Sequence, residues 1–159
     1  MIHRTRATAA LILAGILAGK GSLSAALDPH RERSDYQLLQ EMCFGCCRWF
    51  HQLDFLLEQL LSKPFKKKDQ DLRSLLVLGL YQLKFMRIPD HAAINETVSA
   101  TGELNKRWAR GLSNAVLRNY RRREAELLQN LQLADLAQRE SHPDWLVSAL
   151  TGSWPEQLD

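Results

Sequence analysis

Three cysteines and one histidine lie close enough in the sequence to suggest metal or redox chemistry. Cys43 and Cys46 form a C-x-x-C pair, Cys47 follows directly, and His51 comes four residues later. On a helix these positions share one face. A metal site would need more ligands, and the chain has no second cysteine pair or histidine cluster. The same face is rich in leucine, methionine and phenylalanine, so we interpret the thiols as small core residues, with a metal or redox role as the alternative.

His91 and Glu96 are a second candidate for chemistry, because a histidine and a carboxylate flanking one helical turn could act as general acid and base. The sequence has no glycine-rich nucleotide loop, no H-E-x-x-H and no G-x-S-x-G to support an enzyme site. A buried polar network that fixes helix register is the simpler interpretation of the polar residues in these apolar helices. We expect it to join Asn95, Glu96, Asn114 and Arg118, with Glu96 paired to Arg118.

The distribution of charge points to a polyanionic partner. The chain has 159 residues and a net charge of +3. Residues 1–123 hold 20 Lys and Arg against 11 Asp and Glu, whereas residues 124–159 hold one Arg against seven acidic residues. A basic body of this kind is typical of nucleic-acid binding, and an ordinary solvated surface is the alternative.

Apolar residues recur at three- and four-residue spacing, and no segment alternates as a strand does. We therefore predict an all-α, compact multi-helix bundle of about seven or more helices. Residues 36–61 are predicted to form a long helix with a bend near Gly45 or His51. The next helix, ending at Phe85, is apolar around most of its circumference and should be central and buried.

Two further helices are predicted to begin at capping residues, Asp90 and Asn105. Trp108 and Leu112 fall into the apolar set of the second of these helices, so both are expected to face the core.

The N-terminus resembles a secretory signal peptide, since His3, Arg4 and Arg6 precede the apolar residues 7–18 and small residues follow. The alternative is a first helix of the bundle. The apolar run is too short to span a bilayer, and three free thiols favour a reducing compartment.

Several segments together resemble the NusB-like domain. They are Arg4-x-Arg6-Ala7, HAAINETV at residues 91–98 and GLSNAVLR at residues 111–118. The resemblance implies an all-helical fold that occurs as the transcription antitermination factor NusB. The same fold occurs as the N-terminal domain of bacterial 16S rRNA cytosine-C5 methyltransferases of the RsmB (Sun/Fmu) type.

Other segments resemble the methyltransferase version. They are Cys43-Phe44-Gly45 with Arg48, GLYQL at residues 79–83, Arg87-Ile88-Pro89 and HPDWLV at residues 142–147. The last is similar to the linker into the next domain of those enzymes. The resemblance thus implies a NusB-like RNA-binding helical domain over residues 1–135 and a linker over residues 136–159. It also makes the N-terminal apolar run a core helix of a cytoplasmic protein.

The resemblance implies a domain that positions small-subunit rRNA for a methyltransferase domain of the same polypeptide. That catalytic domain binds S-adenosylmethionine and uses a cysteine in a Pro-Cys dipeptide. This chain has neither a Pro-Cys nor a glycine-rich cofactor loop, so we expect no catalytic residue, cofactor or metal in it, and no membrane partner. The alternatives are a free-standing antitermination factor that binds RNA with a ribosomal protein, and an interaction module without RNA affinity.

We expect RNA to bind a basic face made by the N-terminal arm and the arginine-rich segment, because the guanidinium group binds phosphate well. The predicted contacts are Arg4, Arg6, Lys106, Arg107, Arg110, Arg118, Arg121, Arg122 and Arg123. Lys66, Lys67 and Lys68 are interpreted as a solvated loop with a weaker claim on RNA.

Overall fold

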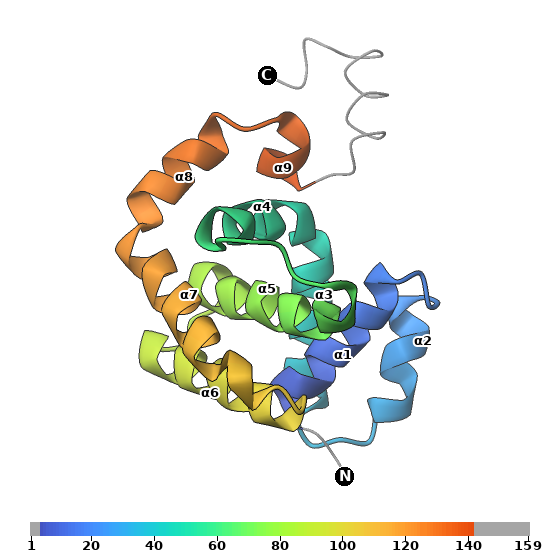
Figure 1. Ribbon diagram of the computed structural model, residues 1–159. Helices are drawn as coiled ribbons and strands as arrows, with labels where there is room; N and C mark the ends of the chain where they lie inside the picture. The colour runs from blue at the N-terminus through green and yellow to red at the C-terminus, as the bar shows by residue number, and fades with distance from the viewer. Residues whose placement is uncertain (1–3, 142–159) are drawn as a thin grey trace, which may run out of the picture.

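The computed structural model of the protein describes residues 4–141, which form nine α-helices and three short 3-10 turns without a strand in that range (Figure 1). The α-helices are α1 (Thr5–Leu17), α2 (Leu23–Leu27), α3 (Tyr36–Arg48), α4 (Phe50–Leu60), α5 (Gln70–Phe85), α6 (Asp90–Glu103), α7 (Arg110–Arg122), α8 (Glu124–Gln132) and α9 (Leu136–Glu140). The 3-10 turns are η1 (Asp28–His30), η2 (Lys67–Asp69) and η3 (Arg107–Ala109). The prediction of an all-α bundle is confirmed.

Helix α5 lies at the centre of the bundle, where α1, α3, α4, α6 and α7 all pack against it (Figure 1). Every residue from Ser74 to Leu83 is buried. A helix that is apolar around its whole circumference can avoid water only if other helices enclose it. The prediction of a central buried helix at this position is therefore confirmed.

Helix α1 packs against α5, α3 and α6, so the segment that resembles a signal peptide is a core helix. Ala7, Ala9 and Ala10 have no exposed surface, and their small side chains let the backbones of α1 and its neighbours approach closely. Among residues 4–141, no helix combines the length and apolarity needed to cross a membrane.

The long helix predicted over residues 36–61 is broken at Trp49 into α3 and α4. The predicted bend is thus confirmed near His51, and Gly45 has a different role. A Cβ atom on Gly45 would lie 2.1 Å from the Tyr81 ring, so glycine is what allows α3 to approach α5. Trp49 at the break stacks on Phe85, with 5.0 Å between the ring centroids.

Two of the three cysteines are core residues, as predicted, but Cys47 is exposed. The buried stripe of α3 runs through Leu39, Met42, Cys43 and Cys46, and at 100° per residue Cys47 lies about a quarter turn from its centre. Burial raises the pKa of Cys43 to about 12 and that of Cys46 well above the ordinary thiol value, so both thiols are protonated near neutral pH.

The buried network expected at Asn95, Glu96, Asn114 and Arg118 is not formed, and that prediction is wrong. Asn95, Glu96 and Arg118 are exposed. Arg118 donates a hydrogen bond of 3.0 Å to Asn114 one turn earlier, on the surface of α7. These polar residues lie on the sides of α6 and α7 that face away from α5, because the opposite sides carry the apolar residues.

The buried polar network centres instead on Gln82 of α5, which has no exposed surface. Its Nε2 donates to Thr97 Oγ1 of α6 at 2.9 Å and to the Leu78 carbonyl at 3.2 Å. Its Oε1 accepts a hydrogen bond of 2.9 Å from Arg6 Nε of α1. One amide side chain therefore joins three helices, and this contact fixes the register of α1 and α6 on α5.

Neither predicted cap serves as one. Asn105 ends α6 rather than beginning α7: its φ of 61° is left-handed, and the Lys106 amide donates back to the Thr101 carbonyl at 2.8 Å. Asparagine tolerates this conformation better than most residues, which suits the end of a helix. Asp90 lies in the first turn of α6, and its carboxylate binds Arg121 instead of a helix amide.

Helices α8 and α9 continue the bundle along α4 (Figure 1). The Gln52 side chain donates to the Arg139 carbonyl at 2.8 Å, and Arg48 donates to the Glu140 carbonyl at 3.2 Å. The predicted boundary at residue 135 between the helical domain and the linker stays a prediction. The structure adds that residues 136–140, which form α9, pack against α4. The linker motif at residues 142–147 lies outside the described residues.

We expect Gln82→Ala to lower the free energy of unfolding by about 2–4 kcal/mol, because it leaves a cavity and removes the partners of Thr97 and Arg6. Glu96→Ala, an exposed change on α6, should stay within about 0.5 kcal/mol of the parent. Urea unfolding followed by circular dichroism measures both. Equal losses for the two variants would contradict the placement of the network at Gln82.

Candidate nucleic-acid interface

Lys106 is one of the predicted RNA contacts, but the structure uses it inside the protein. Its ammonium group pairs with Asp71, lies 3.3 Å from Asp69, and donates to the Lys68 carbonyl at 2.9 Å. Only 16% of the side chain is exposed. Lys106 therefore clamps the segment after α6 to η2 and the start of α5, and its charge is already neutralised within the protein.

Arg121 and Arg123 are also engaged by acidic groups. Arg121 binds Asp90 through two nitrogens at 2.8 and 2.9 Å, pairs with Glu124, and donates to a backbone carbonyl of α5. Arg123 pairs with Glu126 at 3.1 Å. The hydrogen bonds from Arg121 lower the pKa of Asp90 below its ordinary value. Arg121 and Arg123, which flank Arg122 at the end of α7, are thus paired with Asp90 and with the first residues of the acidic C-terminal segment.

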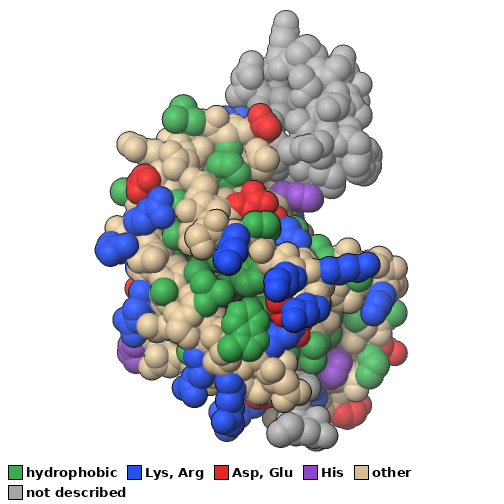
Figure 2. All heavy atoms as spheres, in the orientation of Figure 1, with side chains coloured by type: hydrophobic (Ala, Val, Ile, Leu, Met, Phe, Trp, Pro, Cys, Tyr) green, Lys and Arg blue, Asp and Glu red, His purple; other side chains and the backbone are tan. Residues whose placement is uncertain are grey.

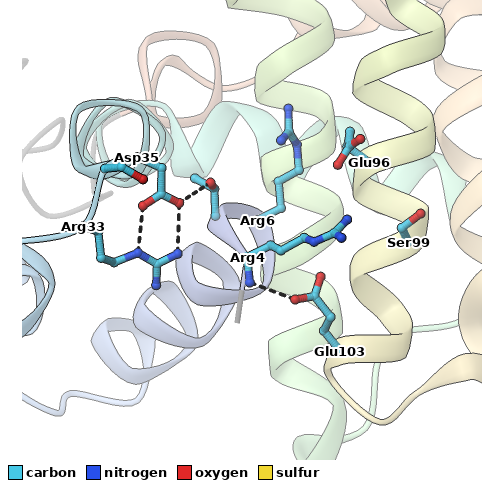
Figure 3. Close-up of a pocket in the computed structure, with 9 residues that line it drawn as sticks. Arg4, Arg6, Arg33, Asp35, Glu96, Ser99 and Glu103 are labelled. Atoms are coloured by element: carbon cyan, nitrogen blue, oxygen red, sulfur yellow. Dashed lines mark hydrogen bonds and ion pairs between the residues drawn. The ribbon is translucent and has the colours of Figure 1, made fainter. Parts of the chain in front are cut away.

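Arg4 and Arg6 line a pocket of about 400 Å³ between α1, α6 and the segment before α3 (Figure 3). The Arg4 side chain extends toward α6, where Glu96 and Glu103 face it, and the Arg4 amide donates to Glu103 at 2.8 Å. Burial lowers the pKa of Arg6, and the charge of Glu96 opposes that shift. Asp35 completes the acidic lining, so this pocket has no net attraction for a phosphate.

An ion pair organises the other side of the same pocket. Arg33 binds Asp35 through two nitrogens at 2.8 and 2.9 Å, and Thr5 at the start of α1 donates to the same carboxylate (Figure 3). These hydrogen bonds lower the pKa of Asp35 to about 2. The pair holds the segment before α3 on α1. His91, the proposed general acid or base, is exposed and does not line this pocket with Glu96.

Four of the predicted contacts form an exposed basic stripe on and just before α7. Arg118 and Arg122 are four residues apart and lie on one face of α7, Arg110 lies in the first turn of the same helix, and Arg107 lies in η3 just before it. Among the described residues, Arg107, Arg110 and Arg122 have no acidic partner, and Arg118 contacts only Asn114. We call these four residues the α7 stripe. Basic side chains follow the edge of the molecule where α7 lies (Figure 2).

Sequence reasoning missed a groove beside the α7 stripe. Trp108 is 64% exposed and Leu112 is 37% exposed, although both were expected in the core. They face residues 61–66, the loop between α4 and η2, across a groove of about 460 Å³. Trp108 is in η3, two residues before α7 begins, so the helical periodicity that placed it in the core does not apply there.

Comparison with known proteins decides the family of this helical domain. The sequence model of the NusB family matches residues 3–122, which is most of the chain. This chain belongs to the NusB family. The resemblance drawn from the segments near residues 4, 91 and 111 is confirmed.

Curated relatives of this NusB-family chain carry methyltransferase names. It is 48% identical over 157 residues to ribosomal RNA small subunit methyltransferase B of Pseudomonas putida, with 97% of this chain and 36% of the relative covered. A protein of the same name from Vibrio vulnificus is 42% identical over 156 residues, with 96% and 36% covered. The probable ribosomal RNA small subunit methyltransferase B of Coxiella burnetii is 36% identical over 155 residues, with 98% of this chain and 35% of the relative covered. The chain therefore spans about a third of the length of these relatives.

The part of the chain that the structure describes holds no group of three or more His, Cys, Asp or Glu residues able to bind a metal ion. His51 is exposed and packs edge-on against Phe50 at 5.9 Å, away from any ligand cluster.

The ion pair between Asp35 and Arg33 should make the free energy of unfolding depend on pH in the acid range. Because the folded-state pKa is lowered to about 2, the charged carboxylate stabilises the fold above the ordinary Asp value of about 3.9, and this contribution is lost as the pH falls toward 2. Asp35→Asn should therefore cost on the order of 1–2 kcal/mol near pH 7, a figure discounted because 27% of the side chain is exposed. Urea unfolding across the pH range measures it.

The gap between Asp35→Asn and the parent should close between about pH 4 and pH 2. Asp28→Asn, which removes an exposed pair with Arg31, is the control and should cost little at any pH. A constant gap down to pH 2 would show that Asp35 acts through packing and not through its charge.

Proposed function

We propose that this chain is the NusB-like RNA-binding domain of a small-subunit rRNA methyltransferase, and that it holds the rRNA for a catalytic domain elsewhere in the same polypeptide. The observation that carries the proposal is the match of nearly the whole chain to about a third of proteins named ribosomal RNA small subunit methyltransferase B. A chain that covers a third of such a protein would supply one of its parts. The antitermination alternative has weaker support, because these relatives carry methyltransferase names.

The α7 stripe is the surface that we propose for the phosphate backbone. Its four arginines are exposed, and none is held by an acidic side chain among the described residues. Arginine presents a planar fork of donors that binds phosphate in a bidentate manner. Contacts of this kind position RNA without reading its sequence, which suits a domain that presents a substrate to a separate catalytic centre.

We further propose that S-adenosylmethionine binding and methyl transfer belong to the catalytic domain, in the cytoplasm. The thiols support this division, since burial holds the pKa of Cys43 and Cys46 far above neutral pH and leaves them unreactive. Cys47 is exposed, but desolvation raises the pKa of its thiol as well, and no charged group among the described residues lowers that pKa.

Filter binding of this chain to fragments of small-subunit rRNA across a salt series tests the proposal. Phosphate contacts release counterions, so the affinity should fall steeply as salt rises. Arg110→Ala combined with Arg122→Ala should weaken binding and lower the salt slope by roughly one unit for each phosphate that is no longer bound.

The matched control is Lys20→Ala combined with Arg31→Ala, which removes the same charge on the α2 side of the bundle (Figure 1). It should bind as the parent does, apart from a small effect of net charge. Equal losses in the two double variants would show that only the overall charge matters, and a parent chain without RNA affinity would overturn the proposal.

Isothermal calorimetry with S-adenosylmethionine tests the division of labour. We expect no saturable heat from this chain, because it has no glycine-rich loop to cradle the cofactor. The same titration on the full-length methyltransferase is the positive control. Stoichiometric binding to this chain would contradict the placement of the cofactor site in the catalytic domain.

A further inference from the structure

The groove beside α7 combines features that an ordinary surface does not bring together. It is lined by Pro64 and Phe65 from the loop between α4 and η2, and by Trp108 and Leu112 from the other side. Trp108 leaves 64% of its surface in water. Tryptophan is the side chain with most to gain from burial, so an exposed ring that lines an apolar groove is a candidate contact surface for a ligand.

The groove is held in shape by the Lys106 clamp. Lys106 comes two residues before Trp108, and it binds the Lys68 carbonyl and the carboxylates of Asp69 and Asp71. Both walls of the groove are thus fixed through one ammonium group. The only acidic residue in the described lining, Asp69, is buried and paired with that same group. The free protein therefore presents an apolar slot without an available negative charge.

Basic side chains line one wall of this slot. Lys63 and Lys66 lie in the loop and Lys68 lies in η2, all exposed, and Arg107 and Arg110 are close in sequence to Trp108 on the other wall. None of these five side chains has a hydrogen-bond or ion-pair partner among residues 4–141. Figure 2 shows a hydrophobic patch in the middle of this face with Lys and Arg side chains around it. An aromatic ring across a groove from unpaired cations is complementary to a chain that alternates flat bases with phosphates.

We propose that this groove binds single-stranded RNA, with an unpaired base stacked on the Trp108 indole and the adjoining phosphates bound by Lys63, Lys66 and Lys68. The inference rests on the proposed RNA-binding function and assigns a base-binding subsite next to the α7 stripe. The bases of an A-form duplex are stacked on one another, so an aromatic platform selects for an unpaired segment. Lys63, Lys66 and Lys68 then contact RNA phosphates, whereas the sequence pattern favoured a loop over residues 66–68 that contacts only solvent.

Fluorescence polarisation with a labelled short single-stranded RNA tests the inference. Trp108→Ala should weaken binding about tenfold, as expected for the loss of one stacked base. The salt slope should stay unchanged, because every cation that binds a phosphate is still present. Trp108→Phe should restore most of the affinity, since a phenyl ring can also stack. The parent should bind the same RNA annealed to its complement more weakly than the single strand.

Two controls separate stacking from other causes. Phe44→Ala removes another exposed aromatic side chain, 46% exposed on α3, and should leave RNA affinity unchanged. Lys63→Gln combined with Lys66→Gln should weaken binding at low salt and also make the salt slope shallower, unlike Trp108→Ala, because fewer phosphates are neutralised. Thermal unfolding should match the parent for Trp108→Ala, because the ring is mostly in water.

The outcomes distinguish this inference from the proposed function. Suppose that Arg110→Ala with Arg122→Ala weakens RNA binding while Trp108→Ala binds as the parent does. The stacking inference is then overturned and the rRNA-binding proposal stands, and the groove would be a contact surface for a protein. If Trp108→Ala and Trp108→Phe lose affinity equally, the ring does not act by stacking and the inference fails. If the parent binds neither single-stranded RNA nor rRNA fragments, both fail.

Discussion

The burial of α5 on all sides is the constraint on which the rest of the bundle depends. Five helices must surround it, and the fully buried side-chain amide of Gln82 must form hydrogen bonds with other protein groups because water cannot reach it. Thr97 and Arg6 supply them from α6 and α1. The same requirement explains why glycine stands at residues 45 and 79, where a Cβ atom would meet the Tyr81 ring and the Leu117 side chain.

Two groups of charged side chains in the protein have different roles. One group joins parts of the fold. Lys106 links the segment after α6 to the start of α5, Arg121 joins α7 to α6 and α8, and the Arg33–Asp35 pair holds the segment before α3 on α1. The other group, which consists of the α7 stripe and of Lys63, Lys66 and Lys68 on the opposite wall of the groove, has no acidic partner among the described residues. The change from basic to acidic sequence at residue 123 is therefore in part internal compensation, since Glu124 and Glu126 neutralise Arg121 and Arg123.

Fold and proposed function meet at Lys106. By pairing with Asp69 and Asp71, it offsets part of the negative charge that would repel RNA from the neighbouring groove, and it ties together the two walls between which Trp108 lies. Such preorganisation lowers the cost of ordering the site when a ligand binds. A residue that the sequence pattern placed among the phosphate contacts thus has an indirect role, as a positioning residue for the surface that surrounds it.

Periodicity and composition alone determined the all-α bundle, the central position of α5 and the burial of Cys43 and Cys46, because a continuous or striped apolar pattern has few ways to avoid water. The motif segments determined the family. Only the tertiary structure decided which polar side chains have partners. Nothing in the sequence indicated that Gln82 and Thr97 pair with each other, and Glu96, Lys106 and Trp108 each had a different environment from the expected one. The reason is that hydrogen bonds, ion pairs and exposure depend on which segments meet in space, and spacing along one helix does not report that.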